Sequence, residues 1–181
     1  MPNVVVIAGP NGAGKSTLAP SLLKDIFGSI EFVNADIIAA GGTTEIEAGK
    51  QMLRRLKELS DRRESFSFET TLSGRGYAKF LKRLQSIGYT VQIAFLWLPD
   101  IELSIQRVAE RVRNGGRDIP EGAIKRRFSR GKRNFLKTYL PLADVWRVYD
   151  ASAEEPKLVG FSDKIDGETI VDKALWERIT E

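Results

Sequence analysis

The sequence contains neither cysteine nor histidine, and both absences narrow the chemistry available to the protein. Without these residues there is no disulfide framework, no zinc site of the usual kind and no Ser-His or Cys-His catalytic pair. A general base in this chain must therefore be a carboxylate, a lysine or a tyrosine. The absence of cysteine also agrees with a cytoplasmic location, which we expect for this protein.

Long apolar runs are absent as well. No apolar segment reaches the roughly 18 residues that a membrane-spanning helix needs, and the run at residues 4–8 is too short for a secretory signal. We therefore expect no membrane association. The 181 residues, of which 42% are hydrophobic, suit a single globular domain over residues 1–181.

The most informative motif that is present lies at residues 9–16, which read Gly-Pro-Asn-Gly-Ala-Gly-Lys-Ser. This is a complete G-x-x-x-x-G-K-[ST] phosphate-binding loop between a β-branched apolar run and a plausible helix start, the context that the motif requires. Its glycines let backbone N–H groups point at phosphate oxygens, while Lys15 reaches the β- and γ-phosphates and the Ser16 hydroxyl can ligate Mg²⁺. The residues predicted to contact the nucleotide are Gly9, Pro10, Asn11, Gly12, Ala13, Gly14, Lys15, Ser16 and Thr17.

Apolar strand-like runs alternate with helical stretches along the chain, which is typical of an α/β fold with a mainly parallel sheet. The predicted strands span residues 3–8, 31–34, 64–69, 89–97 and 144–150. The predicted helices span about 15–26, 44–61, 75–87, 101–113 and 120–137. We expect a last pair to form an edge strand at 157–161 and a terminal helix at 168–179.

Two carboxylates stand where predicted strands end. Asp36 follows the second strand and Glu69 closes the third, directly before Thr70. Because ligands of such sheets lie at the carboxyl ends of the strands, we expect both carboxylates near Lys15. Two structural alternatives stay open, in which Asp36 caps a helix and Glu69 is a solvated strand end.

Basic residues are concentrated in one segment of the chain. Residues 107–137 hold eleven Lys or Arg against three Asp or Glu, a net charge of +8, while the whole chain carries +4. Such a segment suggests polyphosphate or nucleic acid as a partner, or else a solvated helix face. Within it, Gly115 and Gly116 predict a hinged lid at about 113–121 with Arg117 at its tip. Arg127 lies beside the apolar stripe of the next predicted helix, where it faces the core or the site.

Six motifs occur in an order that resembles the zeta-toxin-like P-loop proteins. They are Gly-Pro-Asn-Gly-Ala-Gly-Lys-Ser-Thr, Val-Asn-Ala-Asp, Phe-Glu-Thr-Thr-Leu-Ser-Gly, Gly-Gly-Arg-Asp-Ile-Pro, Arg-Arg-Phe and Val-Tyr-Asp-Ala-Ser. The motifs cover roughly residues 3–152, and the third and fourth are the most specific. The resemblance implies a P-loop kinase-like three-layer sandwich with a parallel five-stranded sheet of order 2-3-1-4-5 and a helical lid. It also implies ATP- and Mg²⁺-dependent phosphorylation of a hydroxyl on a small acceptor such as a nucleotide-sugar.

The resemblance implies a role for each candidate site residue. Asp36 is the base that accepts the acceptor proton, and Glu69 with Thr70 holds the acceptor. Lys15 and Ser16 hold the phosphates and Mg²⁺, and Arg117 and Arg127 meet the transferring group. Ser152 lies near the adenine.

Two other functions stay open. The basic segment favours a polynucleotide-directed kinase, but it lacks interleaved aromatic residues, so nucleic acid is not the expected partner. The third hypothesis is a regulatory nucleotide-binding module with a small antitoxin-like protein partner. A transporter-type ATPase is disfavoured, because its Leu-Ser-Gly signature would follow the phosphate loop here by only about sixty residues.

Overall fold

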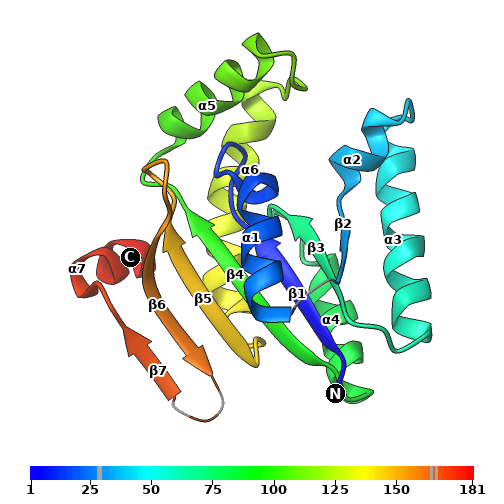
Figure 1. Ribbon diagram of the computed structural model, residues 1–181. Helices are drawn as coiled ribbons and strands as arrows, with labels where there is room; N and C mark the ends of the chain where they lie inside the picture. Colours follow the sequence, from blue (N-terminus) through cyan, green and yellow to red (C-terminus); the bar gives the residue numbers. More distant parts are fainter. Residues whose placement is uncertain (28–29, 164, 166) are drawn as a thin grey trace.

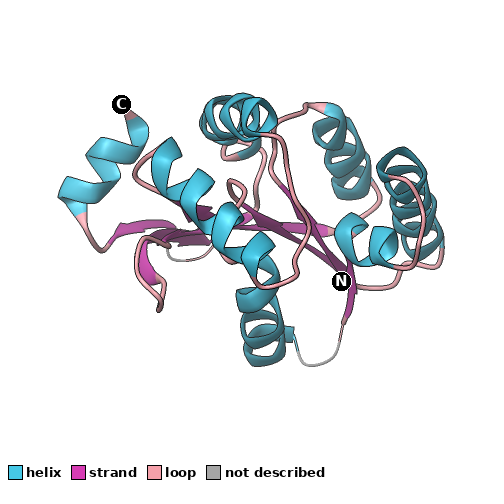
Figure 2. Ribbon diagram, turned by 90° about the horizontal axis from the view of Figure 1, so that it is seen from above, coloured by secondary structure: helices cyan, strands magenta, loops and turns pink. Residues whose placement is uncertain are grey.

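The computed structural model of the protein describes residues 1–27, 30–163, 165 and 167–181. Within these ranges, seven strands form one sheet with helices on both of its faces (Figures 1 and 2). The strands are β1 (Asn3–Ala8), β2 (Glu31–Val33), β3 (Phe66–Thr70), β4 (Thr90–Trp97), β5 (Val145–Asp150), β6 (Lys157–Asp163) and β7 (Gly167–Ile170). The helices are α1 (Lys15–Phe27), α2 (Ala35–Ala40), α3 (Glu45–Asp61), α4 (Gly76–Ser86), α5 (Ile101–Arg113), α6 (Glu121–Asn134), the π-helix η1 (Phe135–Tyr139) and α7 (Lys173–Thr180).

The strand order is β2-β3-β1-β4-β5-β6-β7. The pairs among the first five strands are all parallel, which confirms the α/β fold and the order 2-3-1-4-5 predicted for them. Strands β6 and β7 extend this sheet in antiparallel pairing, so the complete sheet is mixed and larger than expected. The carboxyl ends of the parallel strands share one edge, above which the helices α2 and α5 stand in Figure 1.

One local prediction was wrong, one helix was not predicted, and one predicted helix changes type near its end. Residues 168–170 belong to β7 and not to a helix, because they pair with β6, and this pairing leaves no periodic signal in an exposed segment. The six-residue helix α2 was not expected, and its start is fixed by the Asn34 side chain, which accepts a hydrogen bond from the Asp36 backbone N–H. The predicted helix at 120–137 ends as α6 at Asn134, and the chain continues as the π-helix η1.

Side chains of β1 alternate between two apolar cores. Val4 and Val6 face the larger core, which α3, α4, η1 and α7 cover. Val5 and Ile7 face the smaller one, which is covered by α1 and by residues of α5 and α6. The buried β1 run therefore carries apolar side chains on both faces, as expected for a central parallel strand. No helix among the described residues is long and apolar enough to cross a lipid bilayer.

Contacts from the end of α6 and from η1 fix residues 71–75, the segment that follows β3. Phe95 of β4 stacks on Phe135 of η1 at 4.0 Å between ring centroids, which anchors η1. From the adjoining residues, Asn134 donates to the Leu72 carbonyl at 2.8 Å and the Tyr139 hydroxyl donates to the Gly74 carbonyl at 2.7 Å. Residues 71–75 are thereby held at the carboxyl edge of the sheet, where the candidate site lies.

Candidate active site

The phosphate-binding loop joins β1 to α1 and is fixed by its neighbours. Gly9 and Gly12 have φ angles of 147° and 77°, which other residues rarely adopt. A Cβ atom on Gly9 would lie 2.4 Å from the Leu96 carbonyl oxygen of β4, so a side chain cannot be accommodated there. From α5, the buried Ser104 hydroxyl donates to the Asn11 carbonyl oxygen at 2.5 Å. Strand β4 and helix α5 therefore hold the loop.

Lys15 is the first residue of α1 and is almost completely buried. Its Nζ donates to the Pro10 carbonyl oxygen at 2.9 Å and lies 3.6 Å from Oε1 of Glu69. Burial lowers the pKa of the Lys15 ammonium, while the nearby Glu69 and Asp36 carboxylates act against this shift. A buried ammonium beside backbone N–H groups at a helix start is a strong anchor for a polyphosphate.

Ser16, Glu69 and Asn34 form a hydrogen-bonded cluster at the end of β3. The Ser16 hydroxyl donates to Oε2 of Glu69 at 2.5 Å, and Nδ2 of Asn34 donates to the same oxygen at 2.8 Å. A hydroxyl and a carboxylate are hard oxygen donors, which suit Mg²⁺. In the described part of the chain, no group of three or more His, Cys, Asp or Glu could hold a metal ion. A cation here would therefore need oxygens of a bound polyphosphate, as Mg²⁺ in nucleotide sites does.

Asp36, Arg117 and Glu45 bring three separate segments together. Asp36 lies in the first turn of α2, and the cap of that helix is Asn34, so its carboxylate is not the helix cap. Nη1 of Arg117, in the loop between α5 and α6, lies 3.1 Å from Oδ1 of Asp36. The same guanidinium also contacts the carboxylate of Glu45 at the start of α3. Glu45 was missed from the sequence, because nothing in its local pattern separates it from other helix-start acids.

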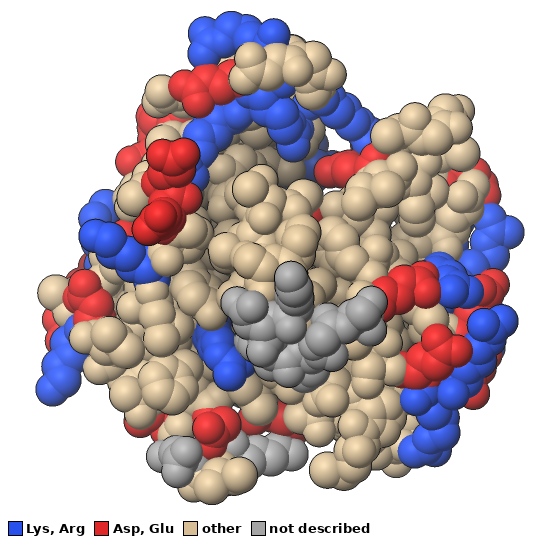
Figure 3. All heavy atoms as spheres, in the orientation of Figure 1, with Lys and Arg blue, Asp and Glu red and all other residues tan. Residues whose placement is uncertain are grey.

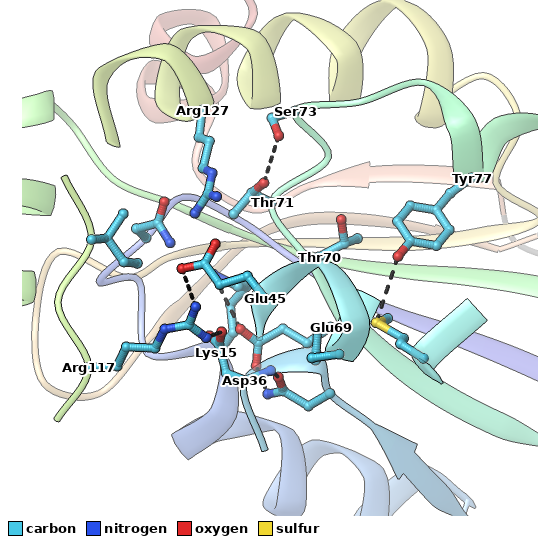
Figure 4. A pocket seen from close by; sticks show the side chains of 16 residues that line it. Lys15, Asp36, Glu45, Glu69, Thr70, Thr71, Ser73, Tyr77, Arg117 and Arg127 are labelled. Carbon is cyan, nitrogen blue, oxygen red and sulfur yellow. Dashed lines mark hydrogen bonds and ion pairs between the residues drawn. The ribbon is translucent and has the colours of Figure 1, made fainter. Parts of the chain in front are cut away.

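A cavity of about 300 Å³ opens above this edge of the sheet, and all the predicted catalytic and acceptor-binding residues line it (Figure 4). Lys15, Asp36, Glu69, Thr70 and Arg117 all line it. Arg127 also lines it, and projects from α6 toward the cavity. The cavity thus has charged groups of both signs on its walls.

Further lining residues were not expected from the sequence. Tyr77, Met52, Ala48 and Ile119 also line the cavity and add apolar surface to it. Its lining also includes Asn11, whose side-chain Oδ1 is buried without a hydrogen-bond partner among the described residues. An unsatisfied buried oxygen is costly, so a ligand that donates a hydrogen bond to it would be favoured.

A second cavity of about 530 Å³ lies on the other side of the phosphate loop. Gly12, Gly14 and Thr17 form one wall, and the carboxyl-terminal half of α5 and the segment 151–156 form the others. Ala151 and Ala153 line the cavity, whereas the predicted nucleotide contact Ser152 lies between them and is exposed. Arg107, which the sequence placed only within the basic segment, lines it as well.

The loop that was predicted to be a lid packs against the helices beside it. Ile119 is 8% exposed and forms a small apolar cluster with Val108 of α5 and Ile124 of α6. Nη2 of Arg111 donates to the Arg117 carbonyl oxygen at 2.7 Å, and the Gly116 N–H donates to the Arg111 carbonyl oxygen at 2.8 Å. These contacts set the backbone position of Arg117. In Figure 3, Lys and Arg side chains gather over this end of α5, beside the hollow of the candidate site.

The parallel 2-3-1-4-5 sheet and the loop that seats Lys15 against its edge are the architecture of a P-loop kinase. Residues 28–155 match the family model of the zeta toxin, and this is more than half of the chain. The chain therefore belongs to the zeta toxin family. The matched range begins after the phosphate-binding loop, so the loop at residues 9–16 is evidence for a P-loop protein that does not depend on this match.

Similar proteins were found in sequence and in structure. An uncharacterized protein of Haemophilus influenzae is 27% identical over 130 residues, which cover 68% of this chain and 91% of that protein. A chain of the AvrRxo1-ORF1:-ORF2 complex with ATP is similar with a TM-score of 0.78 at 18% identity. That similarity covers 100% of this chain and 64% of that chain, so this protein spans less than two thirds of its length.

A third similarity is to a chain of the PezAT chromosomal toxin–antitoxin system of Streptococcus pneumoniae. The TM-score is 0.66 at 21% identity, over 98% of this chain and 78% of that chain. At such identities the structural similarities show the fold of this protein. The family assignment itself comes from the sequence match.

Proposed function

We propose that the protein is an ATP-dependent kinase that transfers the γ-phosphoryl group to a hydroxyl of a small acceptor. The observation that supports this most directly is the shared cavity of Lys15, Asp36 and Glu69. Phosphoryl transfer needs a cradle for the phosphates, cationic groups for the transferring phosphoryl and a base at the acceptor, but little covalent chemistry from the protein. The cavity offers all three to a ligand that bridges the phosphate loop and α2.

In this proposal ATP lies along the phosphate loop. The second cavity takes the base and ribose, since Gly12, Gly14 and Thr17 line it, and the γ-phosphate reaches Lys15 in the first cavity. The complex of AvrRxo1-ORF1:-ORF2 contains ATP, which supports the same nucleotide here. Mg²⁺ would neutralise phosphate charge when bound, held on the protein side by the Ser16 hydroxyl.

Glu69 could act at two places in this arrangement, at the metal-binding hydroxyl of Ser16 and at the acceptor. One oxygen accepts from Ser16 and Asn34, which puts the carboxylate where it can orient the metal-binding hydroxyl. Glu69 and Thr70 also line the first cavity, so an acceptor contact stays a prediction for both. We assign Glu69 primarily to orienting the Mg²⁺-binding hydroxyl, because its Oε2 already accepts a hydrogen bond from Ser16.

Asp36 is proposed as the general base. Its carboxylate takes the proton of the acceptor hydroxyl while the hydroxyl oxygen attacks the γ-phosphorus atom. The bond from the γ-phosphorus to the bridging oxygen breaks, and ADP leaves. Arg117 and Arg127 line the same cavity and stabilise the charge on the transferring phosphoryl group. The loop of Arg117 then acts as the lid.

The acceptor is proposed to be a small hydroxyl compound such as a nucleotide-sugar. The hydroxyl-bearing residues Thr70, Thr71, Ser73 and Tyr77 and the apolar Met52 also line the cavity, a mixture that suits a ring with polar substituents. The similarity to PezAT, a toxin–antitoxin system, makes an antitoxin-like protein a candidate partner. Co-purification of the protein with the product of a neighbouring gene would test this partner.

The decisive experiment incubates the protein with ATP, Mg²⁺ and a fractionated metabolite pool. We expect mass spectrometry to find one compound that gains a phosphate, with one ADP formed for each product molecule. Lys15→Ala, treated in the same way, is the matched control and should give neither. Release of inorganic phosphate from ATP with no phosphorylated compound in any fraction would contradict the kinase proposal.

A further inference from the structure

Arg107 of α5 ties the phosphate-binding loop to the segment that follows β5. Its Nη1 donates to the Ala151 carbonyl oxygen at 2.6 Å and, at 3.4 Å, to that of Gly12. Its Nη2 donates to the carbonyl oxygen of Ser152 at 2.7 Å and, at 3.5 Å, to that of Ala153. One half-buried guanidinium thus meets three consecutive carbonyls of one loop and a fourth from another.

The segment 151–156 connects β5 to β6, and the pairing of Asp150 with Lys157 fixes its two ends. It contains no helix or strand, and only Ala151 among its residues is buried. The Ala151 N–H donates to the Trp97 carbonyl oxygen and the Ser152 N–H to the Asp150 side chain, both at the start of the segment. The Arg107 contacts are the ones that reach across to the phosphate-binding loop. Hydrogen bonds from a charged donor are stronger than neutral ones, so this side chain should set the position of residues 151–153 relative to the phosphate-binding loop.

The same segment forms one wall of the second cavity. Ala151, Ala153 and Pro156 line it opposite Gly12 and Gly14, and Arg107 itself lies between these two walls. Arg107 does not line the first cavity, where the reacting groups lie. Its effect should therefore fall on the part of the ligand beyond the phosphates.

We propose that Arg107 is a positioning residue for the nucleotide base. It holds the segment 151–156 at a fixed distance from the phosphate-binding loop. The segment can then contact the base and ribose, and these contacts raise the affinity for ATP above that for the phosphates alone. The inference rests on the proposed function, because it takes the second cavity to hold the base of ATP. An arginine suits this role better than a lysine, since its planar fork presents two separate nitrogens to the carbonyls, whereas the three donors of a lysine ammonium all lie on one nitrogen.

The test compares two ligands that share the phosphates and differ in the base. Binding of ATP and of inorganic tripolyphosphate, each with Mg²⁺, is measured by calorimetry for the unmodified protein, Arg107→Ala and Arg107→Lys. Arg113→Ala is the matched control, because Arg113 lies on the same helix, is 73% exposed and meets Glu110 only at 3.9 Å. Thermal melting confirms that each variant is folded.

We expect the unmodified protein and Arg113→Ala to bind ATP more tightly than tripolyphosphate. Arg107→Ala should lose about tenfold or more in ATP affinity, which corresponds to about 1.4 kcal/mol, and keep its tripolyphosphate affinity within about twofold. Arg107→Lys should show most of this loss in ATP affinity. If Arg107→Ala does not fold, the lysine variant carries the comparison.

Three results would overturn the inference. An equal loss for both ligands would make Arg107 a support of the phosphate-binding loop, through its contact with Gly12. Unchanged ATP affinity in Arg107→Ala, or full affinity in Arg107→Lys, would remove the positioning role. A different result concerns the proposed function: if the unmodified protein binds neither ligand, the ATP-dependent kinase itself is contradicted.

Discussion

Nη1 of Arg117 lies 3.1 Å from Oδ1 of Asp36, so the arginine of the loop after α5 is paired with the carboxylate proposed as the base. The contact joins residues 81 positions apart, both of which line the first cavity. Both side chains are partly exposed, so the ion pair itself adds little stability. In the proposed mechanism its consequence is functional, because an acceptor hydroxyl would compete with Arg117 for Asp36.

Arg117→Ala should therefore affect the reaction more than nucleotide binding. The variant loses a cation near the transferring phosphoryl, and we expect kcat to fall by about 10³ or less, at the low end for such arginines. ATP affinity should change little. Steady-state kinetics at saturating acceptor, with calorimetry for ATP, checks both. A fall in kcat of less than tenfold would leave Arg117 a surface charge and move its role to Arg127.

Asp36→Asn separates a kinase from a plain ATPase. The substitution keeps the shape of the side chain and removes proton acceptance, so phosphoryl transfer should fall roughly 10²–10⁴-fold, the usual worth of a positioned base. ATP affinity should be kept. Transfer to the acceptor from the metabolite screen is the measurement. Unchanged transfer would make Glu69 the candidate base, and lost ATP binding would indicate a metal-holding role for Asp36.

Lys15→Ala should abolish phosphoryl transfer without unfolding the protein. Burial lowers the pKa of the Lys15 ammonium, so the folded state binds this proton less readily than the unfolded state does. The charged lysine therefore costs stability at pH values below its unfolded pKa, and that cost fades as the pH rises toward this value. At neutral pH the alanine variant should melt no lower than the unmodified protein. Near-normal turnover of ATP would contradict the role of the loop.

Glu69→Gln tests the metal side of the site. The amide keeps the size of the side chain but gives the Ser16 hydroxyl a weaker acceptor than the carboxylate at 2.5 Å. We expect half-maximal ATP binding to need about tenfold more Mg²⁺, while tight binding returns at high Mg²⁺. Titration of Mg²⁺ at fixed ATP measures this, with Glu47→Gln, a residue of α3 that does not line the cavity, as the control. If Glu69→Gln needed no more Mg²⁺ than the unmodified protein, the role of Glu69 would be limited to contacting the acceptor.

Gly116→Ala tests whether the packing of the loop matters for activity. A Cβ atom there would lie 2.5 Å from Cγ and 2.8 Å from the carbonyl oxygen of Arg111, so the loop must shift and carry Arg117 with it. Overpacking of this kind typically costs about 1–3 kcal/mol of stability. We expect a lower kcat, whereas Gly122→Ala, where the nearest atom is 3.5 Å away, should be unaffected. Equal kcat in both variants would show that the Arg117 position is not critical.

Features that depend on a continuous stretch of chain could be predicted from the sequence. The phosphate-binding loop is one run of eight residues whose glycines and lysine act locally, and the apolar run of β1 is buried on both faces. The positions of Asp36 and Glu69 followed from one rule, that the ends of parallel strands share an edge. The order of the five parallel strands came with the family resemblance and is confirmed.

Tertiary structure alone decided which distant residues meet. Nothing in the sequence around Glu45 indicates that it contacts Arg117. Nor does the sequence around Arg107 indicate that this residue donates hydrogen bonds to carbonyls of a loop 44 residues further along the chain. Strand β7 likewise forms because it pairs with β6, although its own residues are mostly exposed and polar. A sequence determines local conformation and burial through nearby side chains, whereas these contacts depend on where the packed helices and sheet place residues far apart along the chain.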